Sequence, residues 1–323
     1  MKTKTAFTLL VCMLIMASLA ACAKASPTPI STAASEAPAE PTAGETGSLA
    51  VKTSAPTDEP TTAPEANANV LPPDPQIITI TTDDNFTLTG YYYPAAAENA
   101  PVVVLMHWMM GDHKDWNEVA VWLQNRGMTN PFENPGDGSQ FRWWDPTWFP
   151  TIPAEKSYAV LVFSFRDCKP WKAGCQSVQR ENWLKDAQAA MQFARELEGV
   201  NPNRIAAIGS SIGADGAADG CKLLNDEFPG ACKGALSLSP GDYLGVSYAT
   251  TVRQLGTSDP AVAAWCIAEP AEYGICQSAE GAGNTAFKGF SIPDGDHGNM
   301  LLRPELDPLP MQLILDFLDE VLK

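Results

Sequence analysis

RIAAIGSSIGADG, residues 204–216, places a serine between a strand pattern and a helix pattern. Residues 204–208 are mostly apolar, which favours a short strand, and the small residues of 212–224 favour a helix. The segment that begins at Gly209 fits the pattern G-x-S-x-G, with Ser211 as its serine. On a sharp strand-to-helix turn this pattern exposes the hydroxyl, and the helix N-terminus favours a developing negative charge. We therefore expect Ser211 to be a nucleophile; the alternative is a tight structural turn.

Strand and helix patterns alternate on both sides of this turn. Residues 102–106 form an unbroken apolar run, as in a strand buried on both faces of a parallel sheet. Residues 76–82 and 86–93 alternate around a turn, which predicts an antiparallel hairpin at one edge. Further strands are expected at 158–165, 204–208, 235–238, 262–268 and 286–292, and helices at 115–124, 181–197, 212–224 and 310–322. The alternation predicts an α/β fold with a doubly wound, mostly parallel sheet.

The general base for Ser211 must come from a small set, because the sequence contains only His107, His113 and His297. His107 follows the strand at 102–106, where an oxyanion loop is expected, and His113 begins the next helix. His297 lies between the last predicted strand and the terminal helix. It alone fits the chain order serine, acid, histidine, so we expect His297 to be the base.

The acid that orients His297 is expected after the preceding strand, 262–268. Glu269 and Glu272 follow that strand, and either would stabilise a protonated imidazole. Counting from the strand end favours Glu272. Asp242, after the strand at 235–238, is a third candidate.

The oxyanion hole should be made of backbone N–H groups. One is expected from Ile212, the residue after the nucleophile. The other is expected from the loop after His107, at Met109, with Trp108 as the alternative.

The motifs occur in one order: His107-x-x-x-Gly111, Phe165-Arg166-Asp167, Gly209-x-Ser211-x-Gly213 and Asp294-Gly295-Asp296-His297-Gly298. This order resembles the α/β-hydrolase superfamily and, within it, the bacterial dienelactone-hydrolase-like and esterase branch. The resemblance spans residues 76–323. Serine stands where true dienelactone hydrolases have cysteine, Trp108 where a glycine is usual, and a glutamate where the triad usually has aspartate.

The resemblance implies an α/β-hydrolase fold and hydrolysis of a small-molecule carboxylic ester through an acyl-enzyme, with no cofactor and no metal. Ser211, His297 and Glu272 would then form the triad. A peptidase and a non-catalytic substrate-binding lipoprotein on the same scaffold are the alternatives.

The first residues resemble a lipoprotein leader. Lys2 and Lys4 precede an apolar run that ends in Leu19-Ala20-Ala21-Cys22, similar to a lipobox. We expect residues 1–21 to be the signal peptide and Cys22 to carry acyl chains such as palmitate. Residues 22–75 are rich in Pro, Thr, Ala, Ser and Glu, which predicts a disordered tether before a domain at 76–323. The expected location is extracytoplasmic, on a bacterial membrane.

The charge and cysteine content agree with an exported enzyme. With 21 Lys and Arg against 38 Asp and Glu, the formal net charge is −17, which argues against a nucleic-acid partner. Six cysteines remain beside Cys12 and Cys22, and an even number in an exported chain implies disulfides. Their close spacing predicts the pairs Cys168–Cys175, Cys221–Cys232 and Cys266–Cys276. A zinc site is disfavoured because no CxxC occurs.

Residues 126–153 form a long insertion rich in aromatic residues. The side chains are Phe132, Phe141, Trp143, Trp144, Trp148 and Phe149. Two interpretations stay open: a satellite core under a long loop, or an aromatic wall for a sugar or aryl group.

Overall fold

The structure, a computed structural model, describes residues 70–132, 144–169 and 174–323. The chain divides into two units, 1–61 and 62–323, and all described residues belong to the second. The expected signal peptide, Cys22 and the tether up to residue 69 lie outside the described residues. Within the described ranges, no helix has the length and apolar character needed to cross a membrane.

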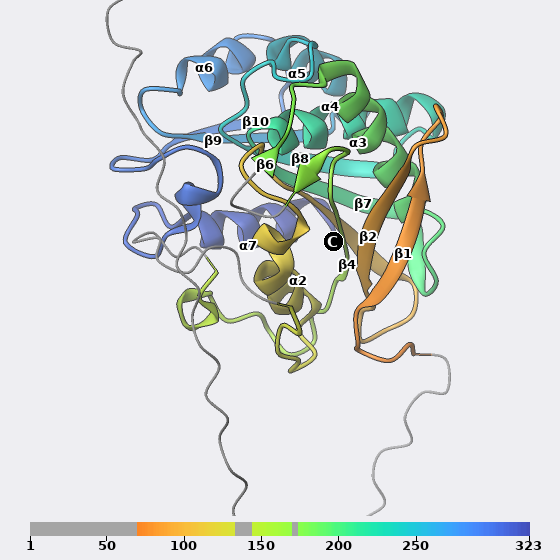
Figure 1. Cartoon of the computed structure of the whole chain (residues 1–323). Coiled ribbons are helices and arrows are strands. Elements are labelled where there is room, and N and C mark those ends of the chain that lie inside the picture. Colours follow the sequence, from red (N-terminus) through yellow and green to blue (C-terminus); the bar gives the residue numbers. More distant parts are fainter. Residues whose placement is uncertain (1–69, 133–143, 170–173) are drawn as a thin grey trace, which may run out of the picture. The chain divides into compact units, whose positions relative to one another are not determined.

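An eight-stranded sheet runs through the domain (Figure 1). Its order is β1 (Gln76–Thr81), β2 (Thr87–Tyr93), β4 (Ala159–Phe163), β3 (Ala100–Met106), β7 (Val200–Ser210), β8 (Cys232–Leu238), β9 (Ala263–Ala268) and β10 (Phe287–Ser291). β2 pairs antiparallel with β1 and with β4, and the other pairs are parallel. The predicted α/β fold, with its hairpin at one edge, is confirmed.

Helices cover both faces of the sheet, so the apolar side chains of β3 and β4 are buried on both sides. One face carries α3 (Arg180–Ala194), α4 (Ile212–Glu227), α5 (Tyr248–Leu255) and α6 (Gly274–Glu280), and the other carries α2 (Asn117–Gln124) and α7 (Pro310–Val321), as Figure 1 shows. Val102 and Val104 of β3 enter the first core, whereas Val103 and Leu105 enter the second. Because β4, β3, β7, β8, β9 and β10 pair in parallel, their C-terminal ends lie along one edge of the sheet.

The small elements that were not predicted from the sequence include α5, α6 and the hairpin of β5 (Cys168–Lys169) with β6 (Gly174–Cys175). α5 contains Thr250, Thr251 and Val252, which favour helices weakly, so tertiary packing decides its conformation. The predicted helix at 115–124 is also divided, since a 3-10 turn at His113–Trp116 precedes α2.

The predicted disulfide pairs are confirmed. Cys168–Cys175 joins β5 to β6, Cys221–Cys232 joins α4 to β8, and Cys266–Cys276 joins β9 to α6. Each bond therefore connects neighbouring elements around one short segment of chain.

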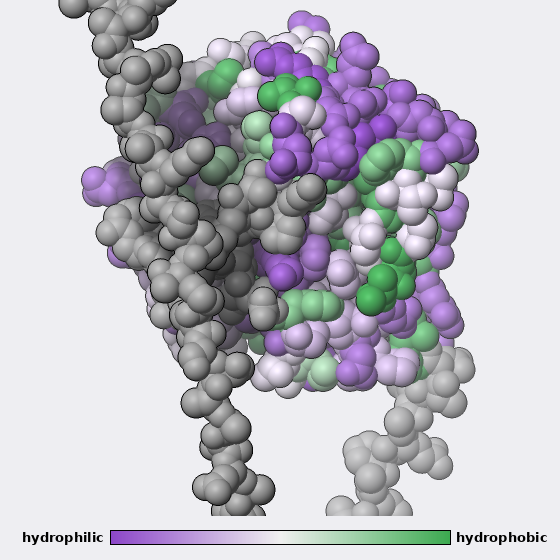
Figure 2. Space-filling view, in the orientation of Figure 1, coloured by the Kyte–Doolittle hydropathy of each residue, from purple (hydrophilic) through white to green (hydrophobic). Residues whose placement is uncertain are grey.

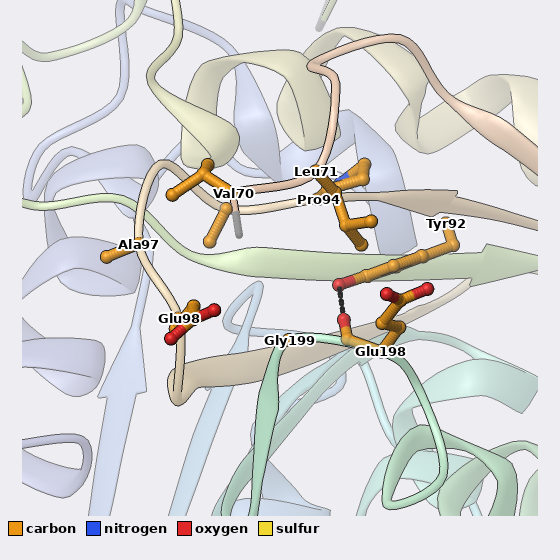
Figure 3. A pocket seen from close by; sticks show the side chains of 9 residues that line it. Val70, Leu71, Tyr92, Pro94, Ala97, Glu98, Glu198 and Gly199 are labelled. Carbon is orange, nitrogen blue, oxygen red and sulfur yellow. Dashed lines mark hydrogen bonds between the residues drawn. The ribbon is translucent and has the colours of Figure 1, made fainter. Parts of the chain in front are cut away.

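The residues just before β1 pack onto the domain. Arg126 Nη1 donates to the carbonyl of Leu71 at 2.8 Å. Leu71 and Tyr92 line a small crevice, in which the Tyr92 hydroxyl donates to the carbonyl of Glu198 at 2.6 Å (Figure 3). The crevice holds only about 10 Å³, roughly the space of one water molecule, so it is a packing gap and not a ligand site.

The described part of the aromatic insertion packs against the domain. The Phe132 ring lies 4.8 Å from the ring of Tyr91, and the Phe149 ring lies 5.3 Å from that of Trp122. Trp144 is only 5% exposed. Residues 133–143, with Phe141 and Trp143, lie outside the described residues. The contacts that are described are those of a satellite core.

Two regions of the face shown in Figure 2 differ in hydropathy. The region over the upper helices is mostly hydrophilic, whereas a hydrophobic patch lies over the β1–β2 hairpin. Ile77 of β1 is 73% exposed. β1 is an edge strand of the sheet and pairs only with β2.

Candidate active site

Ser211 lies in the turn between β7 and α4, at the C-terminal end of a central strand. Its backbone has φ 53° and ψ −117°, a conformation that non-glycine residues rarely adopt. Its N–H donates to the carbonyl of Leu238 at 2.8 Å, which ties the turn to β8. The strained strand–turn–helix that the G-x-S-x-G pattern predicts is present.

The two glycines of the motif are required by close packing. A Cβ at Gly209 would lie 1.9 Å from the carbonyl oxygen of Gly213. A Cβ at Gly213 would lie 2.2 Å from the carbonyl oxygen of Met106 and 2.7 Å from that of His107. The first turn of α4 therefore lies directly beside the loop that follows β3.

His297 and Glu272 form a hydrogen-bonded pair at the ends of neighbouring strands. His297 Nδ1 lies 2.7 Å from Glu272 Oε1; Glu272 follows β9 and His297 follows β10. A proton on Nδ1 that is held by a carboxylate leaves Nε2 free to accept another. Of the other acid candidates, Asp242 Oδ1 instead accepts the N–H of Tyr248 at 2.6 Å. The Glu269 side chain has no described contact with the ring.

The loop that carries His297 is fastened to the strands on either side of the elbow. The Gly298 N–H donates to Ser239 Oγ at 3.0 Å, and the Ser210 hydroxyl donates to Asn299 Oδ1. Ser210 ends β7 and Ser239 follows β8. These bonds hold the histidine loop beside the strand end that carries Ser211.

Tyr243 lies edge-on beside His297. The Tyr243 ring centre lies 6.3 Å from that of His297, with the planes at 86°. Among the described contacts no hydrogen bond joins Ser211 directly to His297. Catalytic hydrogen bonds are often long or poorly aligned before substrate binds.

Sequence reasoning missed Tyr243, Ser239 and Asn299. All three lie at or after the C-terminal ends of strands, on the edge where the elbow lies. Their position after strand ends was the signal in the sequence that could have found them, because loops at the carboxyl ends of parallel strands form the ligand sites of open α/β sheets.

The expected oxyanion donors lie on adjoining segments. Ile212 is the first residue of α4, where an N–H has no partner inside its helix. In the described part of the chain, neither the Ile212 N–H nor the Met109 N–H donates to another protein group. The Met109 carbonyl accepts the N–H of Cys175 at 2.8 Å, which fixes the loop after β3.

The two other histidines have structural partners. His107 is fully buried, Phe165 N–H donates to its Nε2 at 2.9 Å, and its Nδ1 lies 2.6 Å from the carbonyl of Trp108. Burial lowers the pKa of His107 to about 4, so the ring is neutral. His113 stacks on Tyr91 with ring centres 4.1 Å apart, and burial lowers its pKa as well. Neither histidine has a ring nitrogen directed at Ser211 by a described contact.

No metal cluster is found in the parts of the chain that the structure describes: no group of three or more His, Cys, Asp or Glu side chains is placed to hold an ion.

Solved structures share this fold. An esterase of Pyrococcus furiosus is 16% identical, with 77% of this chain and 94% of that chain covered and a TM-score of 0.50. A thermophilic, thermostable carboxylesterase from a metagenomic library is 14% identical, with 79% and 91% covered and a TM-score of 0.51. The 2,6-dihydroxy-pseudo-oxynicotine hydrolase is 11% identical, with 77% and 68% covered and a TM-score of 0.53. No protein-family model and no curated protein matches the chain. At these identities the likeness shows the fold alone, the α/β-hydrolase fold.

Proposed function

We propose that this chain of α/β-hydrolase fold is a serine hydrolase that cleaves carboxylic esters of small molecules. Ser211 is the nucleophile, His297 the general base and Glu272 the acid that orients it. The observation that carries the proposal is the 2.7 Å contact between His297 Nδ1 and Glu272 Oε1, on a loop fastened beside the strained elbow.

In the proposed reaction, Ser211 Oγ bonds to the ester carbonyl carbon while its proton passes to His297 Nε2. The carbonyl π electrons move to the carbonyl oxygen, where the N–H groups of Ile212 and Met109 stabilise the negative charge. The alcohol then leaves with the proton from Nε2, and an acyl-Ser211 remains. Water attacks this acyl-enzyme, with His297 again accepting and returning the proton.

The geometry favours catalysis over a purely structural turn. The backbone at Ser211 costs about 1–3 kcal/mol in strain, which a binding scaffold has no reason to retain. Among the structural neighbours, two are described as an esterase and a carboxylesterase. These descriptions favour ester substrates over the peptidase alternative.

The test is a panel of p-nitrophenyl esters of increasing acyl length, with Ser211→Ala as the control. We expect hydrolysis by the parent protein and covalent labelling of Ser211 by a fluorophosphonate, and neither in Ser211→Ala. A folded parent protein with intact disulfides that neither hydrolyses any ester nor takes the label would contradict the proposal.

We also propose, from the sequence alone, that Cys22 is lipidated and anchors the chain outside the cytoplasm on a bacterial membrane. Cells fed labelled palmitate should transfer the label to the parent protein and not to Cys22→Ser, which should leave the membrane fraction. Equal labelling of the two proteins would refute the anchor.

A further inference from the structure

Asp215 is a buried acid that the proposed reaction does not use. It lies in the first turn of α4, four residues after Ser211, and is only 1% exposed. Taking a carboxyl group out of water is costly unless its oxygens are hydrogen-bonded. Here Oδ1 accepts the N–H of Gly241 at 3.1 Å, and Oδ2 accepts the N–H of Tyr243. The side chain therefore joins the helix that begins at the nucleophile to the loop that follows β8.

The start of that loop, residues 239–243, supports the segment that carries His297. Ser239 is fully buried, and its Oγ accepts the N–H of Gly298 at 3.0 Å. The Ser239 N–H donates to the carbonyl of Ile267 in β9 at 2.8 Å. Because Gly298 directly follows His297, the bond from its N–H restrains the backbone next to the imidazole.

The end of the loop packs against the imidazole itself. The Tyr243 ring lies edge-on to His297, and a Cβ at Gly241 would lie 2.3 Å from Tyr243 Cζ, so the ring rests against Gly241. Asp242, between Gly241 and Tyr243, has φ 57°, a left-handed conformation that persists only where its surroundings enforce it. The two N–H groups held by Asp215 lie on either side of Asp242, so their bonds enforce this conformation.

We propose that Asp215 is a positioning residue of this site: through the loop 239–243 it holds His297 where the ring can take the proton of Ser211. The inference rests on the proposed ester hydrolysis. Ser211 caps α4 and Asp215 lies in the first turn of the same helix, so one turn of helix sets the place of both the nucleophile and the support of its base. A displacement of about 1 Å can cost roughly 100-fold in rate, so a small relaxation of this loop is enough to matter.

The experiment removes one acceptor oxygen and keeps the shape of the side chain. Both oxygens of a carboxyl group can accept an N–H, whether the group is ionised or protonated, whereas the NH2 group of Asp215→Asn cannot. We expect kcat for a p-nitrophenyl ester to fall about 10-fold, with KM changed less than about twofold, because the base is displaced while the groups that bind substrate stay in place. The rate of fluorophosphonate labelling at Ser211 should fall in parallel.

Asp219→Asn is the matched control. It makes the same change one turn further along α4, at a residue that is 4% exposed. Asp219 Oδ1 accepts the hydroxyl of Thr251 in α5 at 2.5 Å, a contact that does not involve the loop 239–243. This variant should keep the parent kcat and labelling rate.

Two double-variant comparisons distinguish positioning from a general structural effect. In His297→Ala the residual rate of ester hydrolysis does not depend on where an imidazole lies, so adding Asp215→Asn should not lower it further. In the parent, Asp215→Asn and Ser239→Ala release the same loop, so their combined loss in kcat should be smaller than the product of the two single losses. Losses that multiply fully in both comparisons would overturn the inference.

The outcomes separate this inference from the proposed function. A parent protein that is neither labelled nor active defeats the proposed function itself. An active parent in which Asp215→Asn loses no more activity than Asp219→Asn overturns the role of Asp215, as does a rise in KM with kcat unchanged. Circular dichroism and the thermal midpoint establish that each variant is folded. Should Asp215→Asn prove unstable, Asp215→Glu, which keeps two acceptor oxygens, must retain more activity than Asp215→Gln for the inference to stand.

Discussion

The backbone at Ser211 is the most constrained point of the site. Its φ of 53° and ψ of −117° are maintained by bonds on both sides: its N–H donates to Leu238, and its carbonyl accepts the N–H of Ala214 at 2.9 Å. Ser211 as a whole is 5% exposed, so it is buried. Strain at one residue is sustained here by hydrogen bonds to two different elements.

Removing the charge of Glu272 should slow the chemistry specifically. Glu272→Gln keeps the shape of the side chain but cannot stabilise a protonated His297. Its side chain is 29% exposed, so water screens part of the effect, and we expect kcat to fall about 100-fold, less than the roughly 10⁴-fold reported for a buried acid. Steady-state ester hydrolysis measures this.

Glu269→Gln is the control, because it makes the same change on the same loop, three residues earlier. It should leave kcat within about twofold of the parent. Equal losses in the two variants would remove Glu272 from its assigned role.

The motif glycines should tolerate no side chain. In Gly213→Ala the new Cβ would lie 2.2 Å from the backbone oxygen of Met106, which cannot move aside as a side chain can. We expect the free energy of unfolding to drop by at least about 2 kcal/mol. Gly274→Ala is the control, since nothing lies within 4 Å of its Cβ, and it should change stability by less than about 0.5 kcal/mol. Urea unfolding measures both variants, provided that the dependence of the unfolding free energy on urea concentration is unchanged. A Gly213→Ala variant as stable as the parent would show that α4 and β3 can separate.

At the scale of elements, the small disulfide hairpin supports the loop after β3. The Cys175 N–H donates to the Met109 carbonyl at 2.8 Å, and a Cβ at Gly174 would lie 2.5 Å from that oxygen. β6 therefore sets the course of the segment from which the second oxyanion donor is proposed. The hairpin lies far from Ser211 in sequence but acts on the same edge of the sheet.

Breaking this disulfide should affect activity as well as stability. Two double variants are compared: Cys168→Ser with Cys175→Ser, and Cys221→Ser with Cys232→Ser. Each removes a disulfide that closes a short loop, and each should lower the free energy of unfolding by about 2–3 kcal/mol. Only the first pair should also lower kcat, by about 10-fold, because only its hairpin holds Met109. Thermal unfolding and ester hydrolysis measure the two effects. Equal kcat values in the two double variants would show that the hairpin does not support the site.

At the scale of the whole molecule, buried acids make stability depend on pH. Asp215 and Asp219 lie on consecutive turns of α4 and are 1% and 4% exposed. Burial raises the pKa of Asp215 to about 8 and that of Asp219 to about 6. The helix therefore carries acids that are more readily protonated in the folded chain than in the unfolded one.

The sign of the pH dependence follows from these directions. An unfolded aspartate titrates near 3.8, so between that value and about 6 the folded chain holds a proton on Asp219 that the unfolded chain has released. For Asp215 the window extends to about 8. Stability gained in this way is present at low pH and is lost as pH rises through the window, so these two acids should contribute more to the free energy of unfolding near pH 5 than near pH 8.

Asp219→Asn tests this assignment. The amide oxygen can still accept the hydroxyl of Thr251, which lies 2.5 Å from Asp219 Oδ1, but it does not titrate. Denaturant midpoints near pH 5 and pH 8 should differ less in this variant than in the parent. Asp226→Asn, an exposed change near the end of the same helix, should retain the full difference. A variant at position 219 that keeps the parent's pH dependence would assign the effect to other groups.

The sequence alone determined the features that depend on local patterns. Apolar periodicity and turn residues predicted the sheet, most helices and the elbow at Ser211. The spacing of apolar residues along a segment shows whether that segment is buried on one face or on two. Close spacing predicted the disulfide pairs, since short loops bring their own ends together. The order serine, acid, histidine restricted the base to His297.

Tertiary structure alone decided which side chains meet. The sequence favoured Glu272 only by its distance from the strand end and left Glu269 and Asp242 as alternatives. The packing of the loops after β8, β9 and β10 places the carboxylate of Glu272 at His297. Tyr243 packs beside His297 although the two residues are far apart in the sequence. Such contacts depend on which strands are neighbours in the sheet and on the exact conformation of each loop. Neither can be read from the periodicity of a single segment.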